Sequence, residues 1–389
     1  MSEDPVPDWR DDIFAALKAA EIRQIGYVPD AGHTRLIEHC RADPEIRAIV
    51  LTSEEEGIGL AAGAWLGGRA PAVVMQNSGL GTSLNALVSL SLLYRLPALL
   101  LVTWRGHGGA DAPEHILMGE ISPALLDLIR IPHRVLTATG AAAEIHWAKT
   151  ESSRLSQPVA LLVPPGLLET RAHEAGGVSQ APVEAGRADT SGPPPVASIS
   201  RSEALQAAVK ALGREPVVHA NGYICRESFA VRDRPENFYM IGSMGLASSI
   251  GLGAALARDD RTVVIFDGDG NLLMNLGILP MIGDAGRRRR PRRFVHIVFD
   301  NGVYASTGGQ PSPGQATRLD RVAAAAGYAR TVCVTTAREI SLALTEALES
   351  EGPSFLLARV TAEDKPAPRI PYPPEEIRDR FRRALGGSP

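Results

Sequence analysis

Short apolar runs alternate with helical stretches along the first half of the chain. The runs have the length of strands, and they lie at 48–52, 70–76, 97–104 and 158–165. Each is apolar at consecutive positions, so both faces of each strand must be covered. Such strands, separated by helices, predict a parallel sheet with helices on both faces.

The alternation begins again near residue 200. A helical segment at 200–212 precedes strand-like runs at 216–220, 238–242, 262–268, 294–301 and 354–360. Between the halves, residues 169–199 are rich in Gly, Pro, Ala and Ser without apolar periodicity, which predicts an exposed linker. We therefore expect an α/β protein with two doubly wound parallel-sheet domains, residues 1–168 and 200–389.

The composition gives no global reason to expect a nucleic acid or a membrane as partner. Hydrophobic residues make up 44% of the 389 residues, charged residues 22%, and the formal net charge is -4. Six arginines occur within 287–293, where we expect a solvated loop. The acidic N-terminus lacks a signal-peptide pattern and no apolar run reaches the ~20 residues of a membrane helix, so we expect a cytoplasmic protein. The three scattered cysteines argue against zinc and against a disulfide framework.

An acidic, glycine-rich turn follows one predicted strand. The run 262–268 leads into Gly268, Asp269, Gly270 and Asn271 before a helical pattern resumes. Glycines let a phosphate approach backbone N–H groups, and a carboxylate beside that phosphate requires a divalent cation between them. A tight turn with an asparagine cap is the alternative.

The next predicted strand also ends in polar residues. Asn301 follows Asp269 by 32 positions. If the two strands are neighbours in a parallel sheet, their carboxyl ends lie side by side at the edge where open α/β sheets bind ligands. Asn301 would then offer its side-chain oxygen, and Val303 its carbonyl oxygen, to the same Mg²⁺ or Ca²⁺ ion as Asp269.

Together these motifs resemble the cofactor motif of thiamine diphosphate-dependent enzymes. The resemblance implies thiamine diphosphate and Mg²⁺ as cofactors, and a glutamate of the other domain that contacts the aminopyrimidine ring and promotes loss of the thiazolium proton. In the sequence EEEGIGLAAG the glycine and paired-alanine pattern places Glu55 in this role, with Glu54 or Glu56 as alternatives if the register differs. An acid-rich helix N-terminus is the plain alternative.

Two further stretches are similar to segments that surround the cofactor in this family. The resemblance implies that a turn after the run 70–76 lines the pyrimidine pocket through Ser78, Gly79 and Gly81. It also implies that the Gly242 carbonyl accepts a hydrogen bond from the 4′-amino group and that Met244 holds the cofactor in a bent conformation. Simple packing of small helix residues is the alternative for the second stretch.

The two-domain layout, without a middle domain, resembles the phosphonopyruvate and sulfopyruvate decarboxylases of the family. It implies non-oxidative decarboxylation of a 2-oxo acid, with 3-phosphonopyruvate as first candidate substrate, sulfopyruvate as alternative, and phosphonate biosynthesis as the pathway of the former. The candidate residues for a proton relay titrating near neutral pH are Asp30 and His33, and those for binding the oxyanion are Arg105, His115, Ser306 and Thr307. Relatives often carry serine directly after the Val-Pro-Asp of residues 28–30, where this chain has Ala31, so substrate choice stays open.

The family pattern also implies a homodimer or homotetramer with the active site between subunits. Other functions remain possible from the sequence: a carboligase of the acetolactate synthase kind, a non-catalytic thiamine diphosphate-binding protein, or a Mg²⁺-dependent nucleotide-binding module. Glu55 distinguishes a catalytic function from the two binding functions, because a protein that only binds phosphate groups does not need this glutamate.

Overall fold

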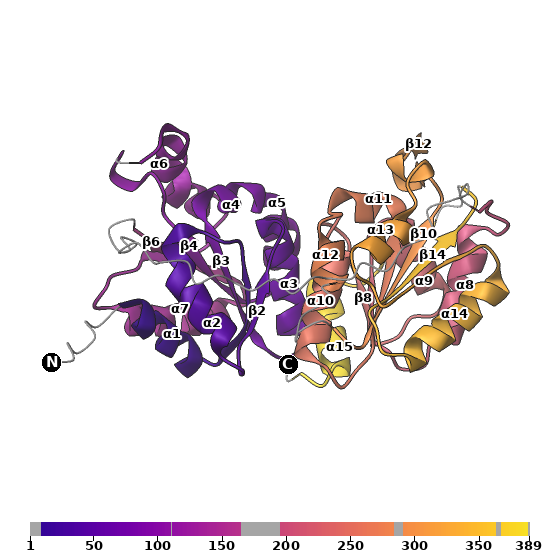
Figure 1. The fold of residues 1–389 in the computed structure, drawn as a ribbon, viewed down its shortest axis with the longest axis horizontal. Helices are drawn as coiled ribbons and strands as arrows, with labels where there is room; N and C mark the ends of the chain where they lie inside the picture. The colour runs from indigo at the N-terminus through magenta and orange to yellow at the C-terminus, as the bar shows by residue number, and fades with distance from the viewer. Residues whose placement is uncertain (1–8, 110, 165–194, 284–290, 363–366, 388–389) are drawn as a thin grey trace. The chain divides into compact units, whose positions relative to one another are not determined.

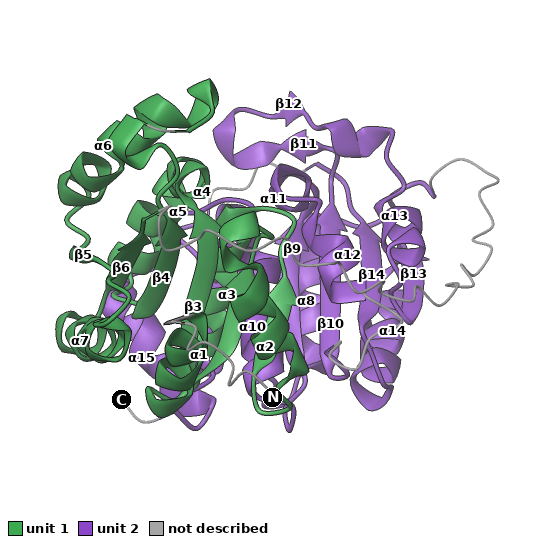
Figure 2. Ribbon diagram, turned by 60° about the vertical axis from the view of Figure 1, so that its left-hand side comes forward, with its two compact units in different colours: residues 1–65, 69–179 green, residues 66–68, 180–389 purple. Residues whose placement is uncertain are grey.

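The computed structural model describes residues 9–109, 111–164, 195–283, 291–362 and 367–387 (Figure 1). The chain divides into two compact units, residues 1–65 with 69–179 and residues 66–68 with 180–389 (Figure 2). Each unit contains one six-stranded sheet, which confirms the predicted fold class. Residues 169–194 of the predicted linker and 287–290 of the arginine cluster lie outside the described residues.

The first unit is built on a wholly parallel sheet with the strand order β2-β1-β3-β4-β6-β5. Its strands are β1 (Ile22–Tyr27), β2 (Arg47–Val50), β3 (Ala70–Gln76), β4 (Ala98–Thr103), β5 (His133–Val135) and β6 (Pro158–Val163). Its α-helices are α1 (Trp9–Ala19), α2 (Thr34–Ala42), α3 (Glu54–Leu66), α4 (Asn77–Thr82), α5 (Leu84–Ala86), α6 (Pro113–Leu128) and α7 (Ala141–Leu155), and a π-helical turn spans Leu87–Leu92.

Consecutive residues of the central strands are buried on opposite faces of the sheet. Leu99 and Leu101 of β4 belong to the core that also contains Leu17 of α1, Leu36 of α2 and Ile145 of α7. Leu100, between them, is equally buried on the opposite face of the sheet. The consecutive apolar positions of the sequence thus reflect a strand covered on both sides.

The second unit repeats this architecture with the strand order β13-β14-β10-β9-β7-β8, again wholly parallel. Its strands are β7 (Val217–His219), β8 (Asn237–Tyr239), β9 (Val263–Gly268), β10 (Phe294–Asp300), β13 (Arg330–Val334) and β14 (Ser354–Arg359), and β11 (Val303–Tyr304) pairs with β12 (Gln310–Pro311) as a separate hairpin. Its helices are α8 (Arg201–Ala211), α9 (Tyr223–Val231), α10 (Ala247–Ala257), α11 (Asp269–Met274), α12 (Ile278–Gly283), α13 (Leu319–Ala325), α14 (Ala337–Glu349) and α15 (Pro374–Ala384).

Two glycines let helices approach their sheets closely. A Cβ atom on Gly57 of α3 would lie 2.7 Å from Leu51 and 2.9 Å from Val73, and one on Gly251 of α10 would overlap the side chain of Ile265. Side chains at these positions would push the helices away. The small residues at the start of α3 therefore set where its glutamates lie.

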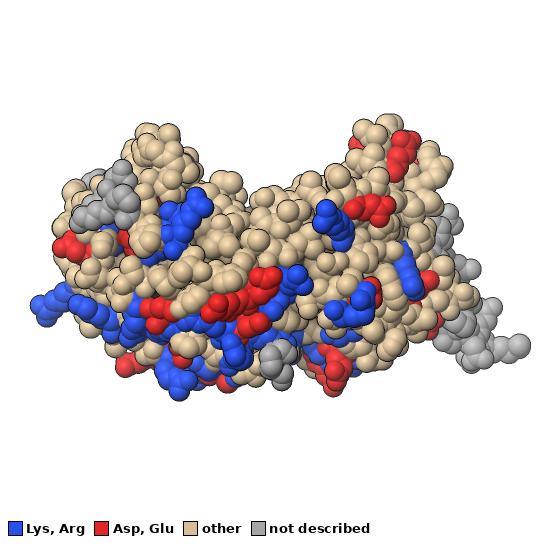
Figure 3. Space-filling view, turned by 180° about the vertical axis from the view of Figure 1, so that it is seen from behind, with Lys and Arg blue, Asp and Glu red and all other residues tan. Residues whose placement is uncertain are grey.

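Charges on the surface are mixed. On the face drawn in Figure 3, Lys and Arg are interspersed with Asp and Glu. None of the described helices is long and apolar enough to cross a membrane. The three cysteines are free thiols, and Cys40 and Cys225 are buried.

Candidate active site

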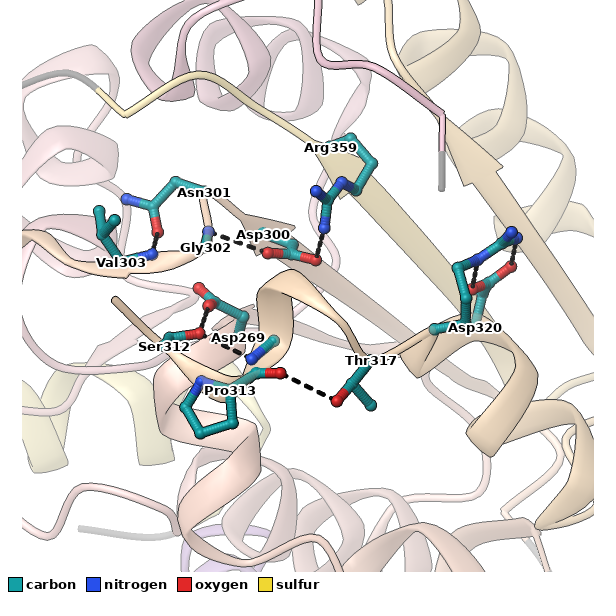
Figure 4. Close-up of polar contacts among 12 residues, drawn as sticks. Asp269, Asp300, Asn301, Gly302, Val303, Ser312, Pro313, Thr317, Asp320 and Arg359 are labelled. Carbon is teal, nitrogen blue, oxygen red and sulfur yellow. Dashed lines mark hydrogen bonds and ion pairs between the residues drawn. The ribbon is translucent and has the colours of Figure 1, made fainter. Parts of the chain in front are cut away.

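Two acids lie side by side at the carboxyl edge of the second sheet. Strands β9 and β10 pair in parallel with Gly268 opposite Phe299, so the next residues, Asp269 and Asp300, are neighbours. Burial and the nearby Asp300 raise the pKa of Asp269 to about 6. Asp300 accepts hydrogen bonds from the guanidinium of Arg359 and, at 3.0 Å, from the backbone N–H of Gly302 (Figure 4).

Asp269 itself has an uncharged partner. The hydroxyl of Ser312 donates a hydrogen bond to its Oδ2 atom, and the backbone N–H of Gly314 donates to Ser312 Oγ at 3.0 Å. Figure 4 shows the carboxylate of Asp269 facing the turn that contains Asn301 and Val303. At that turn, the backbone N–H of Val303 donates to Asn301 Oδ1 at 3.1 Å.

Asn271 connects the glycine-rich turn to the loop that carries Gly242 and Met244. Its Oδ1 atom accepts from the backbone N–H of Gly245 at 2.7 Å, and its Nδ2 atom donates to Asp267 Oδ1 at 2.6 Å. Asp267 Oδ2 in turn lies 3.1 Å from Nε2 of the fully buried His296. Both ends of the Asn271 amide are therefore engaged within the protein.

The three glutamates at the start of α3 have different surroundings. Glu56 is fully buried and accepts a hydrogen bond from the hydroxyl of Thr52. Glu54 packs against α4, because a Cβ atom on Gly79 would overlap its side chain. Glu55 is half-buried, burial raises the pKa of its carboxyl, and none of the described residues hydrogen-bonds to that carboxylate.

The segment after β3 is a helix instead of the expected turn. Residues Asn77–Thr82 form α4 directly after the strand; Ser78 and Gly81 are exposed, whereas Gly79 is buried. Asn77, fully buried, donates from Nδ2 to the carbonyl of Arg105 at 2.9 Å and to Ser122 Oγ at 3.1 Å, while its Oδ1 atom has no hydrogen-bond partner among the described residues. A strand that continues into a helix without a break leaves no room for a separate turn.

Asp30 and His33 share one turn after β1, but His33 does not have the expected neutral-range titration. Asp30 Oδ1 accepts from the N–H of Gly32 at 2.9 Å and from the hydroxyl of Thr103 at 3.1 Å. His33 is 1% exposed, and burial lowers its pKa to about 4, so its ring is neutral at pH 7. Its Nε2 atom has no hydrogen-bond partner in the part of the chain that the structure describes.

The candidate oxyanion-binding residues are divided between the units, with Arg105 and His115 in the first and Ser306 and Thr307 in the second. The Arg105 guanidinium makes a bidentate pair with Asp111 through Nε (2.7 Å) and Nη2 (2.6 Å) and holds the pKa of that carboxyl well below its usual range. His115 lies near the start of α6 and is half-buried. Ser306 and Thr307 are exposed on the connection between β11 and β12.

The oxygen atoms of Asp269, Asn301 and Val303 are suitable ligands for a hard cation whose remaining ligands come from a phosphate group. Among the described residues there is no group of three or more His, Cys, Asp or Glu placed to hold a metal ion. Instead, one buried carboxylate that bonds to a hydroxyl accompanies amide and carbonyl oxygens, and phosphate oxygens would complete such a shell. The turn also requires glycine at residue 270, since a Cβ atom there would lie 2.5 Å from the ring of Tyr304.

Several residues of this site had not been expected. Ser312 and Arg359 contact the two acids, Asp267 accepts a hydrogen bond from Asn271, and His296 contacts Asp267. Asp267 stands next to the glycine-rich motif and could have been found as the second acid of that stretch. The other three come from distant parts of the chain and carry no local signal.

The comparisons with known proteins define the class. Residues 8–126 match the family described as thiamine pyrophosphate enzyme, N-terminal TPP binding domain, and residues 224–358 match the corresponding C-terminal TPP binding domain; thiamine pyrophosphate is another name for thiamine diphosphate. Together these matches cover well over half of the chain, which belongs to the thiamine pyrophosphate enzymes.

Two decarboxylases are similar to the chain along most of its length. It is 36% identical over 386 residues to phosphonopyruvate decarboxylase of Streptomyces viridochromogenes, an alignment that covers 95% of this chain and 93% of that protein. It is 34% identical over 350 residues to sulfopyruvate decarboxylase of Methanosarcina acetivorans, covering 88% of each. The chain is therefore a member of the thiamine pyrophosphate-dependent decarboxylases.

A solved structure agrees with the fold. The Rhodococcus jostii thiamine diphosphate-dependent 4-hydroxybenzoylformate decarboxylase superposes with a TM-score of 0.69 at 14% identity, covering 92% of this chain and 100% of that chain. In Methanocaldococcus jannaschii, two separate proteins named sulfopyruvate decarboxylase subunit beta and subunit alpha match 48% and 39% of this chain at 36% and 39% identity.

Proposed function

We propose that this chain decarboxylates 3-phosphonopyruvate to phosphonoacetaldehyde and CO₂, using thiamine diphosphate and Mg²⁺. The observation that carries the proposal is the oxygen donor set around Asp269, in a chain that matches a phosphonopyruvate decarboxylase along nearly its whole length. The reaction consumes one proton, which replaces the carboxylate on the carbonyl carbon. The pathway would then be phosphonate biosynthesis.

The second unit would hold the diphosphate end of the cofactor. Asp269, Asn301 and the carbonyl of Val303 would coordinate Mg²⁺, and the bare backbone of Gly268 and Gly270 would approach the phosphates. Asn271 contributes indirectly, because its amide fixes the loop of Gly242 and Met244. That loop would support the pyrimidine ring.

The first unit would hold the aminopyrimidine end of the cofactor. Thiamine diphosphate, when bound, supplies an electron sink for the electron pair left by CO₂. Glu55 would hydrogen-bond to the aminopyrimidine ring, a role that its half-burial, raised pKa and unengaged carboxylate support. Ser78, Gly79 and Gly81 of α4 would border the ring.

Substrate recognition would fall to groups near the carboxyl ends of the strands. Arg105 keeps Nη1 outside its pair with Asp111, and we assign to it, with His115, Ser306 and Thr307, the binding of the phosphonate oxygens. Asp30 and the neutral ring of His33 would position the proton delivered to the product. We further propose a homodimer or homotetramer in which the two half-sites of each active site come from different subunits.

Sulfopyruvate is the second candidate substrate, favoured by the 34% identity to a sulfopyruvate decarboxylase over 88% of the chain. A sulfonate carries one negative charge where a phosphonate carries up to two. Comparison of the two substrates therefore tests how much cationic charge the site offers.

The experiment is to measure CO₂ release and free aldehyde from phosphonopyruvate, sulfopyruvate and pyruvate, each with and without thiamine diphosphate plus Mg²⁺. We expect cofactor-dependent release from phosphonopyruvate. Glu55→Gln should lower kcat at least ~1,000-fold yet bind the cofactor, whereas Glu54→Gln should stay within about threefold of the parent. A ligation product in place of aldehyde would show a carboligase, and full activity of Glu55→Gln would refute its role.

A further inference from the structure

We infer that Ser312 is a positioning residue that presents Asp269 to the metal ion and ties the hairpin 303–311 to the metal site. This inference rests on the proposed function, because it concerns the Mg²⁺ ion of that site. It assigns a role to a residue that neither the motif nor the comparisons identify.

The hydroxyl of Ser312 has a fixed direction. Its oxygen accepts from the backbone N–H of Gly314 at 3.0 Å, and its hydrogen is donated to Asp269 Oδ2. Ser312 is 4% exposed, so water does not compete for these bonds. The bond holds Oδ2 of Asp269 and thereby fixes the orientation of the carboxylate. The other oxygen, Oδ1, would then be presented to the cation.

Gly314 makes this contact possible. A Cβ atom at residue 314 would lie 2.9 Å from both Asp269 Oδ2 and Ser312 Oγ. Any larger residue would have to displace one of the two bonded groups. The sequence Ser-Pro-Gly at 312–314 is thus shaped around the carboxylate.

The backbone of Ser312 reaches the other expected ligands. Its N–H donates to the carbonyl of Gly302 at 2.8 Å, and Gly302 is the residue between Asn301 and Val303. This bond adjoins the pairing of Val303 with Pro311 and of Tyr304 with Gln310, so it closes the base of the hairpin. Ser312 therefore contacts Asp269 through its side chain and the Asn301–Val303 turn through its backbone.

The hairpin is also anchored on the glycine-rich turn. The ring of Tyr304 lies over Gly270, whose added Cβ atom would be 2.5 Å from it. Movement of the turn on cation binding must therefore be accommodated by the hairpin, which carries Ser306 and Thr307 at its connection. Cation binding should order the residues assigned to substrate binding.

The test uses Mn²⁺ in place of Mg²⁺, titrated in the presence of thiamine diphosphate, with free Mn²⁺ measured by electron paramagnetic resonance. We expect Ser312→Ala to bind Mn²⁺ about tenfold more weakly and Gly314→Ala to show a loss of similar size, whereas Ser312→Thr stays within about threefold of the parent. Thr317→Ala is the matched control, because Thr317 bonds to Pro313 of the same turn but not to Asp269. It should bind Mn²⁺ as the parent does.

Hydrogen exchange of the peptide 302–312 gives a readout that does not depend on activity. Protection should rise when Mn²⁺ and thiamine diphosphate are added to the parent or to Thr317→Ala, and should not rise in Ser312→Ala. Parent-like Mn²⁺ affinity in Ser312→Ala, or equal losses in Ser312→Ala and Thr317→Ala, would overturn the inference and leave the proposed function intact. A parent that binds no Mn²⁺ with thiamine diphosphate would overturn both.

Discussion

Asp269 and Asp300 stand side by side at the ends of two neighbouring parallel strands, but their carboxylates are compensated differently. Arg359 pairs with Asp300, whereas Asp269 bonds to the uncharged hydroxyl of Ser312 and has its pKa raised to about 6. A buried acid beside a second acid is stabilised when a cation arrives. The protein without ligands therefore carries a local electrostatic cost that metal binding would relieve.

Asp269→Asn should stabilise the ligand-free protein at high pH. Because the pKa of Asp269 in the folded state lies above its usual 3.8, its ionisation lowers the free energy of unfolding as pH rises from about 4 to above 6. The variant should gain ~2 kcal/mol over the parent at pH 8 and nothing at pH 4. Thermal unfolding across this range measures the difference, and the exposed Asp127→Asn is the control.

In the presence of Mg²⁺ and thiamine diphosphate, the parent should become more stable than Asp269→Asn. Only the parent retains the carboxylate, so its melting temperature should rise on addition of both and fall again with a chelator. If the Asp269→Asn variant gained as much as the parent, Asp269 would not be a ligand of the metal.

His33→Gln should make the protein more resistant to acid. The folded-state pKa of about 4 lies below the usual 6.5, so the unfolded chain binds more protons and the folded state loses stability as pH falls from about 6.5 to 4. The parent should lose up to about 3 kcal/mol in this interval from this group alone. Urea unfolding at pH 7 and pH 4.5 tests this, with the exposed His146→Gln as control; equal acid sensitivity of parent and His33→Gln would contradict it.

Asn271→Asp should be severely destabilising. The amide nitrogen lies 2.6 Å from Asp267 Oδ1, and a carboxylate in its place would face another carboxylate in a buried site. We expect a loss of ~2–4 kcal/mol at pH 8, smaller at pH 5 where the two acids can share a proton. Urea denaturation at both pH values measures it, and the exposed Asn85→Asp should change little.

Arg105→Lys should weaken substrate binding more than turnover. A lysine cannot pair with both oxygens of Asp111 and also present a further N–H group to an anion. We expect KM for phosphonopyruvate to rise about tenfold or more with a smaller change in kcat. Arg154→Lys, which breaks a similar bidentate pair with Glu151 on α7, should leave both constants unchanged. A change confined to kcat would argue against oxyanion binding by Arg105.

The sequence predicted those strands that are buried on both faces, because such strands must be apolar at consecutive positions. Strands such as β4 and β9 are apolar at consecutive positions, because both faces are covered. Strand β1 was not predicted, because Arg23, Gln24 and Gly26 interrupt its pattern, although Gln24 is buried. Strand β13 was missed for a similar reason: it is at the edge of its sheet and only half-buried along most of its length.

The residues of the site likewise divide into those that the sequence predicted and those that it did not. The neighbouring positions of Asp269 and Asn301 followed from two strand ends and the rule for parallel sheets, and β9 and β10 do pair. Ser312 lies 43 residues from Asp269, and its contact depends on the path of a loop, which no periodicity encodes. The burial of His33 was equally invisible, since it depends on packing around a short 3₁₀ turn.

Each unit encloses a core of its own, one around α1, α2 and α7 and the other around α8, α9 and α14. Each of these two clusters draws its residues from one unit alone, and in relatives the alpha and beta subunits are separate proteins. Joining two such modules in one polypeptide fixes their stoichiometry at one to one. In evolutionary terms, a gene fusion or fission at this point changes how the enzyme is assembled without requiring either sheet to be redesigned.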